Sequence, residues 1–140
     1  MHVVAELENT FLPLLLEAKV VAESAYPQFK FNVGSSSVGG KTEYQGHNVW
    51  LECTFPDAAD HEADSVALLV GVKHITTQPK LCDASVEWGN GHHPKVSLEL
   101  LEEPTLFTEQ ALQQTAARLP ELLQVFRRAL EAWAVRGADA

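Results

Sequence analysis

In the middle of the chain, apolar residues recur at every second position, and this alternation constrains the fold more than any other feature. It is regular over residues 49–55, where other residues separate Val49, Leu51, Cys53 and Phe55. Successive side chains of a β-strand point to opposite faces, so the pattern predicts a strand with one buried face. Four more strands are predicted, over residues 28–33, 65–75, 81–88 and 95–101, and in the last of them the alternation buries Val96, Leu98 and Leu100. The 65–75 run is apolar on both faces, which predicts a central strand that is covered on both sides or packed against another subunit.

Toward both ends of the chain the apolar spacing changes to three or four residues, which is the period of a helix. Residues 3–26 carry the first such pattern. Pro13 interrupts it, and proline is tolerated in the first turn of a helix but not in its interior. With Asn9 or Thr10 as the N-cap, we therefore expect the main helix to run from about Phe11 to Ala25, after a looser lead-in that is helical or extended.

A second long helix is predicted near the C-terminus. Thr108 is placed to cap its first turn, and an apolar stripe then runs over residues 112–133. The stripe keeps its phase through Pro120, so we expect a kink at this proline rather than a break.

These elements predict a single α+β domain over residues 1–140. The simplest topology is a five-stranded antiparallel meander sheet, in the order 1-2-3-4-5, with the N- and C-terminal helices packed on one face. Gly89-Asn90-Gly91 supplies the residues that a tight hairpin needs between the last two strands. The opposite face of the sheet is then open to a ligand, a partner or a second copy of the chain.

The charge of the chain argues against some partners. Ten Lys and Arg against 19 Asp and Glu give a net charge of −9, which disfavours binding to nucleic acid or to an anionic membrane. Cys53 and Cys82 lie on the apolar sides of two predicted strands, and we expect both to be reduced and unreactive. No apolar run approaches the ~18 residues that span a bilayer, and no basic leader precedes the first helix. We therefore expect a cytoplasmic protein.

Six histidines raise the question of a metal site. In the meander, His61, His92 and His93 fall at the same end of the sheet as Asp57 and Asp60. Imidazole and carboxylate groups bind Zn²⁺, but no His-Glu-x-x-His spacing fixes two ligands on one element. These three histidines are weak metal candidates, and we expect neither a metal nor another cofactor.

His47 and His74 fall at the other end of the sheet, within a cross-strand diagonal. Histidine is the usual general base, but we expect no nucleophile and no oriented carboxylate beside this pair. The nearby Ser35 and Ser37 belong to a stretch rich in glycine and serine that lacks the strand-to-helix context of a phosphate-binding loop. We interpret these serines as turn residues, and we assign no catalytic residue.

The open sheet face contains the residues that we expect to bind a partner. Trp50 has the opposite phase to Val49 and Leu51, which places it on that face, and aromatic residues are enriched at interfaces. The other candidates share the face with Trp50: they are Thr54, Asp83, Ser85 and Glu87.

The leading functional hypothesis is a non-catalytic protein-binding or accessory protein that uses this open face. A narrower version is an immunity-type protein that neutralises a basic toxin domain, because the chain is acidic. Two alternatives stay open. One is a small-molecule-binding protein or enzyme with a His-containing site. The other is a homodimer with a structural role, in which the open face closes against a second copy.

Overall fold

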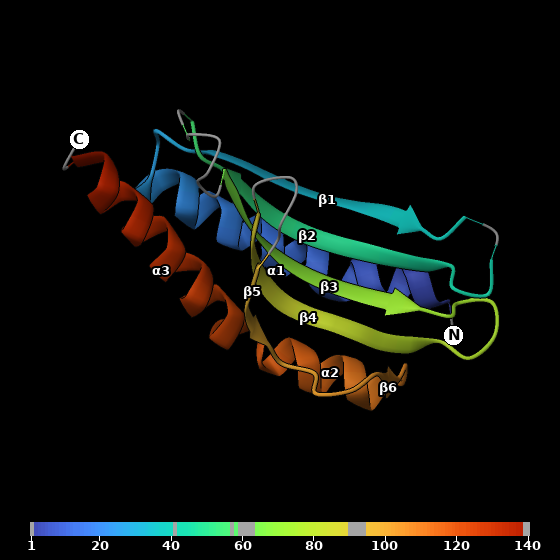
Figure 1. The fold of residues 1–140 in the computed structure, drawn as a ribbon. Helices are drawn as coiled ribbons and strands as arrows, with labels where there is room; N and C mark the ends of the chain where they lie inside the picture. Colours follow the sequence, from blue (N-terminus) through green and yellow to red (C-terminus); the bar gives the residue numbers. More distant parts are fainter. Residues whose placement is uncertain (1, 41, 57, 59–63, 90–94, 139–140) are drawn as a thin grey trace.

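The alternating segments form an antiparallel sheet that is backed by helices on one face (Figure 1). The computed structural model describes residues 2–40, 42–56, 58, 64–89 and 95–138. The elements follow in the order α1 (Val3–Ala25), β1 (Lys30–Val38), β2 (Gly46–Thr54), β3 (Ser65–Lys73), β4 (Lys80–Gly89), β5 (Lys95–Glu99), β6 (Thr105–Leu106), α2 (Glu109–Ala117) and α3 (Leu119–Ala138).

The sheet has the predicted meander order, β1-β2-β3-β4-β5, with every neighbouring pair antiparallel. A short strand, β6, was not predicted. It pairs with β4 through Lys80 and Leu81, next to the end of β5. Two residues are too few to show an alternating pattern, so the sequence carries no signal for this strand.

The core lies between the sheet and the helices. Leu51, Leu68 and Val86 form one cross-strand row on the helix side, and none of them is exposed to solvent. Helix α1 adds Phe11 to this core and α3 adds Phe126. Complete burial of each such side chain contributes roughly 1.5–3 kcal/mol, so these contacts hold the helices on this face.

Helix α1 is longer than predicted. It begins at Val3 and passes through Pro13 without ending, so the expectation of a helix from about Phe11 was wrong. Proline removes one backbone hydrogen bond and crowds the preceding turn, whereas Leu7, Phe11 and Leu15 bury completely on both sides of it. Tertiary packing therefore outweighs the local cost of the proline.

The C-terminal helical stripe is broken rather than kinked, so this prediction was also wrong. Helix α2 ends at Ala117, and α3 begins at Leu119. Pro120 is the second residue of α3, in the first turn, where its missing N–H costs little. The predicted cap is confirmed, because the Thr108 Oγ1 accepts a hydrogen bond from the Ala111 N–H at 3.0 Å.

Two irregularities in β4 and β5 shift the predicted alternation. Gly71 pairs with Asp83 and Val72 pairs with Leu81, so Cys82 has no partner across from it. Cys82 is half-buried, not fully buried as expected. A second shift places Val96 opposite Glu87 on the open face, where it is 57% exposed, although the alternation predicted it to be buried.

Candidate functional site

The open sheet face is the first candidate site. In Figure 1, α1 lies behind the sheet, α3 and α2 lie to its left and below it, and none of these described helices crosses its front. The strand register aligns the open-face residues in rows. The central row is Gly34, Trp50, Leu69, Ser85 and Glu99.

Trp50 lies where its phase predicted, and the neighbouring strand holds its ring in place. Gly34 is directly opposite Trp50, and a Cβ added at Gly34 would lie 2.8 Å from the indole Cζ2. The ring therefore occupies the space that a side chain would fill at Gly34. Because the indole packs against the sheet, it offers a half-buried aromatic surface at little cost in side-chain entropy.

Carboxylates gather on the β4 and β5 side of this face. Burial raises the pKa of Glu87, and the negative charges of Asp83 and Glu99 raise it further. The Glu99 carboxylate is held in place, because its Oε1 accepts hydrogen bonds from the Ala84 N–H at 3.0 Å and the Leu101 N–H at 3.1 Å. This part of the face is therefore a region of concentrated negative charge.

Ser85 differs from its predicted environment. It belongs to the open-face row, but it is fully buried rather than exposed. Its Oγ has no hydrogen-bond partner among the described residues. A buried polar atom that lacks a partner costs about 1–3 kcal/mol, so this hydroxyl has the capacity to bind an added donor.

Thr54 lies at the end of β2 and is exposed, as predicted for the open face. It pairs with Lys30 on one side and with Ser65 on the other. The structure thus places all five predicted open-face residues on one side of the sheet, with Ser85 beneath the surface.

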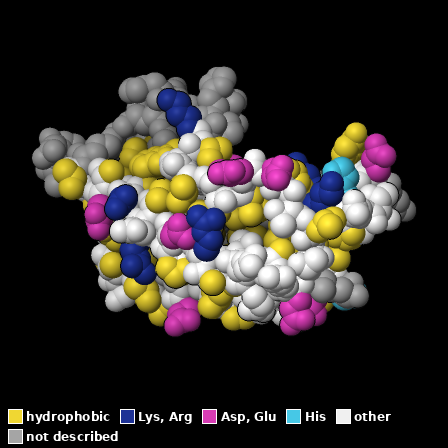
Figure 2. Space-filling view, turned by 90° about the horizontal axis from the view of Figure 1, so that it is seen from below, with side chains coloured by type: hydrophobic (Ala, Val, Ile, Leu, Met, Phe, Trp, Pro, Cys, Tyr) yellow, Lys and Arg dark blue, Asp and Glu magenta, His cyan; other side chains and the backbone are white. Residues whose placement is uncertain are grey.

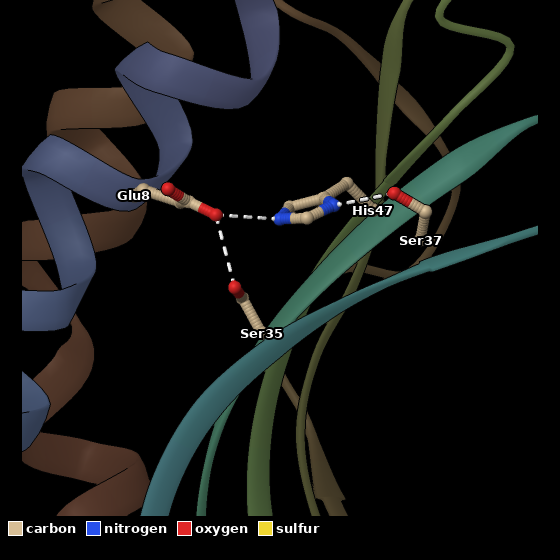
Figure 3. Close-up of polar contacts among 4 residues, drawn as sticks. All are labelled: Glu8, Ser35, Ser37 and His47. Atoms are coloured by element: carbon tan, nitrogen blue, oxygen red, sulfur yellow. Dashed lines mark hydrogen bonds and ion pairs between the residues drawn. The ribbon is translucent and has the colours of Figure 1, made fainter.

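A polar cluster on the helix side of the sheet forms a second candidate site (Figure 3). His47 is 6% exposed, and its Nε2 donates to the Glu8 Oε1 at 2.8 Å. Since this bond places the proton of a neutral ring on Nε2, the Nδ1 can accept from the Ser37 hydroxyl, 3.1 Å away. Ser35 Oγ also donates to Glu8 Oε1 at 2.9 Å. The two bonds lower the pKa of Glu8, with the bond to His47 as the largest cause.

This cluster corrects two expectations. His47 has an oriented carboxylate and a hydroxyl beside it, whereas none was expected, and Ser35 and Ser37 lie in strand β1 rather than in a turn. The cluster was missed because Glu8 lies on the part of α1 before Pro13, which was not expected to be regular helix. One signal was available, since Ser35 and Ser37 continue the inward phase of Phe31.

His74 does not join this cluster. His74 adopts a left-handed backbone with φ 58°, and its ring contacts Tyr44 at a centroid distance of 5.5 Å. The metal candidates His61, His92 and His93 lie outside the described residues. Within the part of the chain that is described, no group of three or more His, Cys, Asp or Glu side chains is arranged to hold a metal ion.

A third feature is an apolar groove on the helix layer. A cavity of about 320 Å³ lies between α1 and α3, and a neighbouring cavity of about 270 Å³ extends toward the start of α3. Ala18, Val21, Leu123 and Arg127 line both of them. Leu16 and Val20 line neither cavity and are exposed elsewhere on α1, at 50% and 66%.

The side of the molecule that carries α2 has a different character. In Figure 2, hydrophobic, basic and acidic side chains are mixed on this side, and no large area has a single sign of charge. One oppositely charged pair there is Arg118 with Glu121, whose Nε and Oε2 are 2.8 Å apart. Mixed charge of this kind is typical of an ordinary solvated surface.

The fold is an α+β domain with helices on one face of the sheet and no described helix over the other. Comparisons with protein families, with curated proteins and with solved structures find no match. No helix in the described residues has the length and apolar character needed to cross a membrane.

Proposed function

We propose that this chain is a non-catalytic protein-binding or accessory protein that docks a partner protein on its open sheet face. The observation that carries the proposal is Trp50, whose indole lies against Gly34 on a sheet face that no described helix covers. Tryptophan is among the residues most enriched in binding hot spots, and a ring that is already held loses little entropy on binding. Leu69 and Val96 supply further apolar surface on the same face.

The charge of the face supports a basic protein as the partner. Asp83, Glu87 and Glu99 lie close together in a molecule of net charge −9. Such a field attracts a basic protein and disfavours nucleic acid and anionic membranes. An immunity-type role toward a basic toxin domain is the narrower form of this proposal. Two free cysteines, Cys53 and Cys82, support a cytoplasmic setting.

The test compares Trp50→Ala with a matched control on the helix side. Leu16→Ala removes an exposed apolar side chain from α1, and it leaves the sheet untouched. Each tagged variant is used to recover partners from the source cell extract, and the recovered protein is then repurified and titrated against all three forms. We expect Trp50→Ala to weaken binding of that protein at least tenfold and Leu16→Ala to weaken it less than twofold. Equal affinities of the three forms, or loss only with Leu16→Ala, would reject the open face, and the second result would point to the outer surface of α1.

A second copy of the chain is the competing occupant of the same face. The exposed Val96 and the half-buried Leu69 favour it, because apolar open-face residues are buried when two sheets stack. Light scattering over a concentration series decides between a second copy of the chain and a different partner protein. A dimer that Trp50→Ala dissociates supports self-association, whereas a monomer at all concentrations leaves the face for a different protein.

An enzyme with a His-containing site is the alternative from another class. The geometry that favours it is the Glu8, His47 and Ser37 array, in which the imidazole polarises an exposed hydroxyl. A fluorophosphonate probe that labels Ser37 in the wild type but not in His47→Gln would support this activity. Absence of labelling, with the fold intact, would leave the cluster a structural role.

A further inference from the structure

Three acidic residues of the open face are the neighbours of Ser85 on β4 and β5, and the Ser85 hydroxyl is buried. Asp83 and Glu87 are each two residues from Ser85 on the same strand, so their side chains share its face. Glu99 is directly opposite Ser85 on β5. The hydroxyl at the centre of this group is fully buried and has no partner among the described residues.

No cation of the described chain neutralises this group. The ion pairs of the described residues lie elsewhere, and they join Lys19 to Glu23, His47 to Glu8, and Arg118 to Glu121. Lys95, at the start of β5, lies opposite Trp88 and so next to Glu87, but it forms none of these ion pairs. The other lysines of these strands are Lys73 and Lys80. They lie opposite each other, beyond the irregularity at Cys82. The group therefore combines carboxylates that form no ion pair among the described residues with a hydroxyl that has no partner there, and what it lacks is a donor with positive charge.

We propose that the cluster of Asp83, Glu87 and Glu99 around Ser85 receives an arginine side chain of the partner protein. This inference rests on the proposed function. A guanidinium group is planar and weakly hydrated, and its five N–H donors match several carboxylate oxygens at once. The buried Ser85 Oγ is able to accept one of these N–H groups once the side chains that cover it move apart to admit the guanidinium.

The position of Trp50 fits the same ligand. Trp50 and Ser85 lie in one row, with Leu69 between them. Neighbouring strands are about 4.8 Å apart, so about 10 Å separates the two outer positions. An arginine whose guanidinium lies in the carboxylate cluster can place its methylene stem over Leu69, which leaves the indole to an adjacent residue of the same partner segment.

The electrostatics of Glu87 agree with this assignment. Burial and the charges of Asp83 and Glu99 both raise its pKa. A bound cation would oppose these effects, because it stabilises the charged carboxylate. The pKa of Glu87 is therefore a direct reporter of cation binding at this position.

The first experiment uses a small probe on the purified chain. N-acetyl-arginine methylamide is titrated against isotope-labelled protein, and the matched neutral probe is N-acetyl-citrulline methylamide, which has nearly the same shape. We expect the arginine probe to bind with a dissociation constant of about 1–10 mM, as is ordinary for a fragment of this size. Its NMR shift changes should centre on Ser85 and Glu87, and the pKa of Glu87 should fall. The citrulline probe should bind at least fivefold more weakly.

Variants separate the site from general charge attraction. Glu87→Gln should weaken arginine binding at least fivefold, whereas Glu6→Gln, which removes the same charge from the exposed first turn of α1, should change it less than twofold. Ser85→Ala should also weaken it, because the carboxylates remain but the hydroxyl is lost. Equal binding of the two probes, equal effects of the two glutamine variants, or shift changes centred on other residues would each overturn the proposal.

Failure of the arginine subsite and failure of the proposed function give different experimental results. A partner that depends on Trp50 but binds Glu87→Gln and Ser85→Ala normally would reject the arginine subsite alone. Specific binding of the arginine probe without any partner that depends on Trp50 would reject the proposed function alone.

Discussion

At the scale of single residues, Glu8 links the start of α1 to the sheet. Its carboxylate accepts bonds from His47 and Ser35, and these bonds lower its pKa. A group whose pKa is lower in the folded state contributes stability above its ordinary value, near 4.5, and loses that contribution as the pH falls through the folded pKa. The link between α1 and the sheet should therefore weaken in acid.

We predict that Glu8→Gln lowers the melting temperature at neutral pH and that its difference from wild type shrinks as the pH falls below about 4.5. The measurement is thermal unfolding by circular dichroism over a pH series. Glu6→Gln is the control, since Glu6 is exposed on the same helix. A difference that stays constant from neutral to acidic pH would show that the Glu8 carboxylate does not act through its charge.

Ser85 gives a second prediction at this scale. Its buried Oγ has no partner among the described residues, so Ser85→Ala removes an unsatisfied group rather than a hydrogen bond. We expect the free energy of unfolding to rise by about 0.5–1 kcal/mol, measured by urea denaturation. Ser36→Ala, on the exposed part of β1, should leave it unchanged. Destabilisation by Ser85→Ala would mean that the hydroxyl is bonded in solution.

At the scale of elements, α1 carries a proline in its interior. The backbone of Pro13 lacks the N–H that would bond to the carbonyl of Asn9, and an interior proline costs about 3 kcal/mol relative to alanine. Part of this cost is returned, because proline also restricts the unfolded chain. We predict that Pro13→Ala stabilises the fold by about 2 kcal/mol in urea denaturation. Pro120→Ala should give no such gain, because Pro120 lies in the first turn of α3.

The apolar patterns predicted the five long strands because burial of a strand face leaves a trace in the strand's own residues, and the simplest connection of consecutive strands predicted their order. Alternation failed where a strand departs from regular geometry, as at Cys82 and Val96, because a single extra residue reverses the phase of all residues beyond it. The helix boundaries were harder to predict. The local cost of Pro13 is visible in the sequence, but the burial of Leu7 that offsets it is not.

At the scale of the molecule, the candidate sites depend on contacts between distant segments. Trp50 could be placed on the open face from its own strand alone, because the residues directly before and after it belong to the buried face. The bond from His47 to Glu8 joins residues 39 positions apart, and no local pattern specifies such a contact. The carboxylate group was predicted only in part. Asp83 and Glu87 share a strand, but Glu99 joins them through the shifted register of β5.

The two thiols report on the whole fold. Cys53 is fully buried between the sheet and the helices, and burial raises its pKa to about 12. Cys82 is half-buried at the irregularity of β4, and burial raises its pKa to a smaller extent. Because the thiolate is the reactive form, Cys53 should react with a disulfide reagent only after the sheet and helices separate, whereas Cys82 should react in the native state.

We predict that only Cys82 reacts with the reagent in the native protein, and that it does so slowly. In denaturant, both thiols should react. In Cys82→Ser, the remaining Cys53 should be modified at a rate that follows the equilibrium unfolding curve as urea is added, because global opening is its route to solvent. In Cys53→Ala, the rate at Cys82 should depend little on urea below the transition. Rapid modification of Cys53 without denaturant would mean that the helix layer opens locally, and the helix face would then have to be considered mobile.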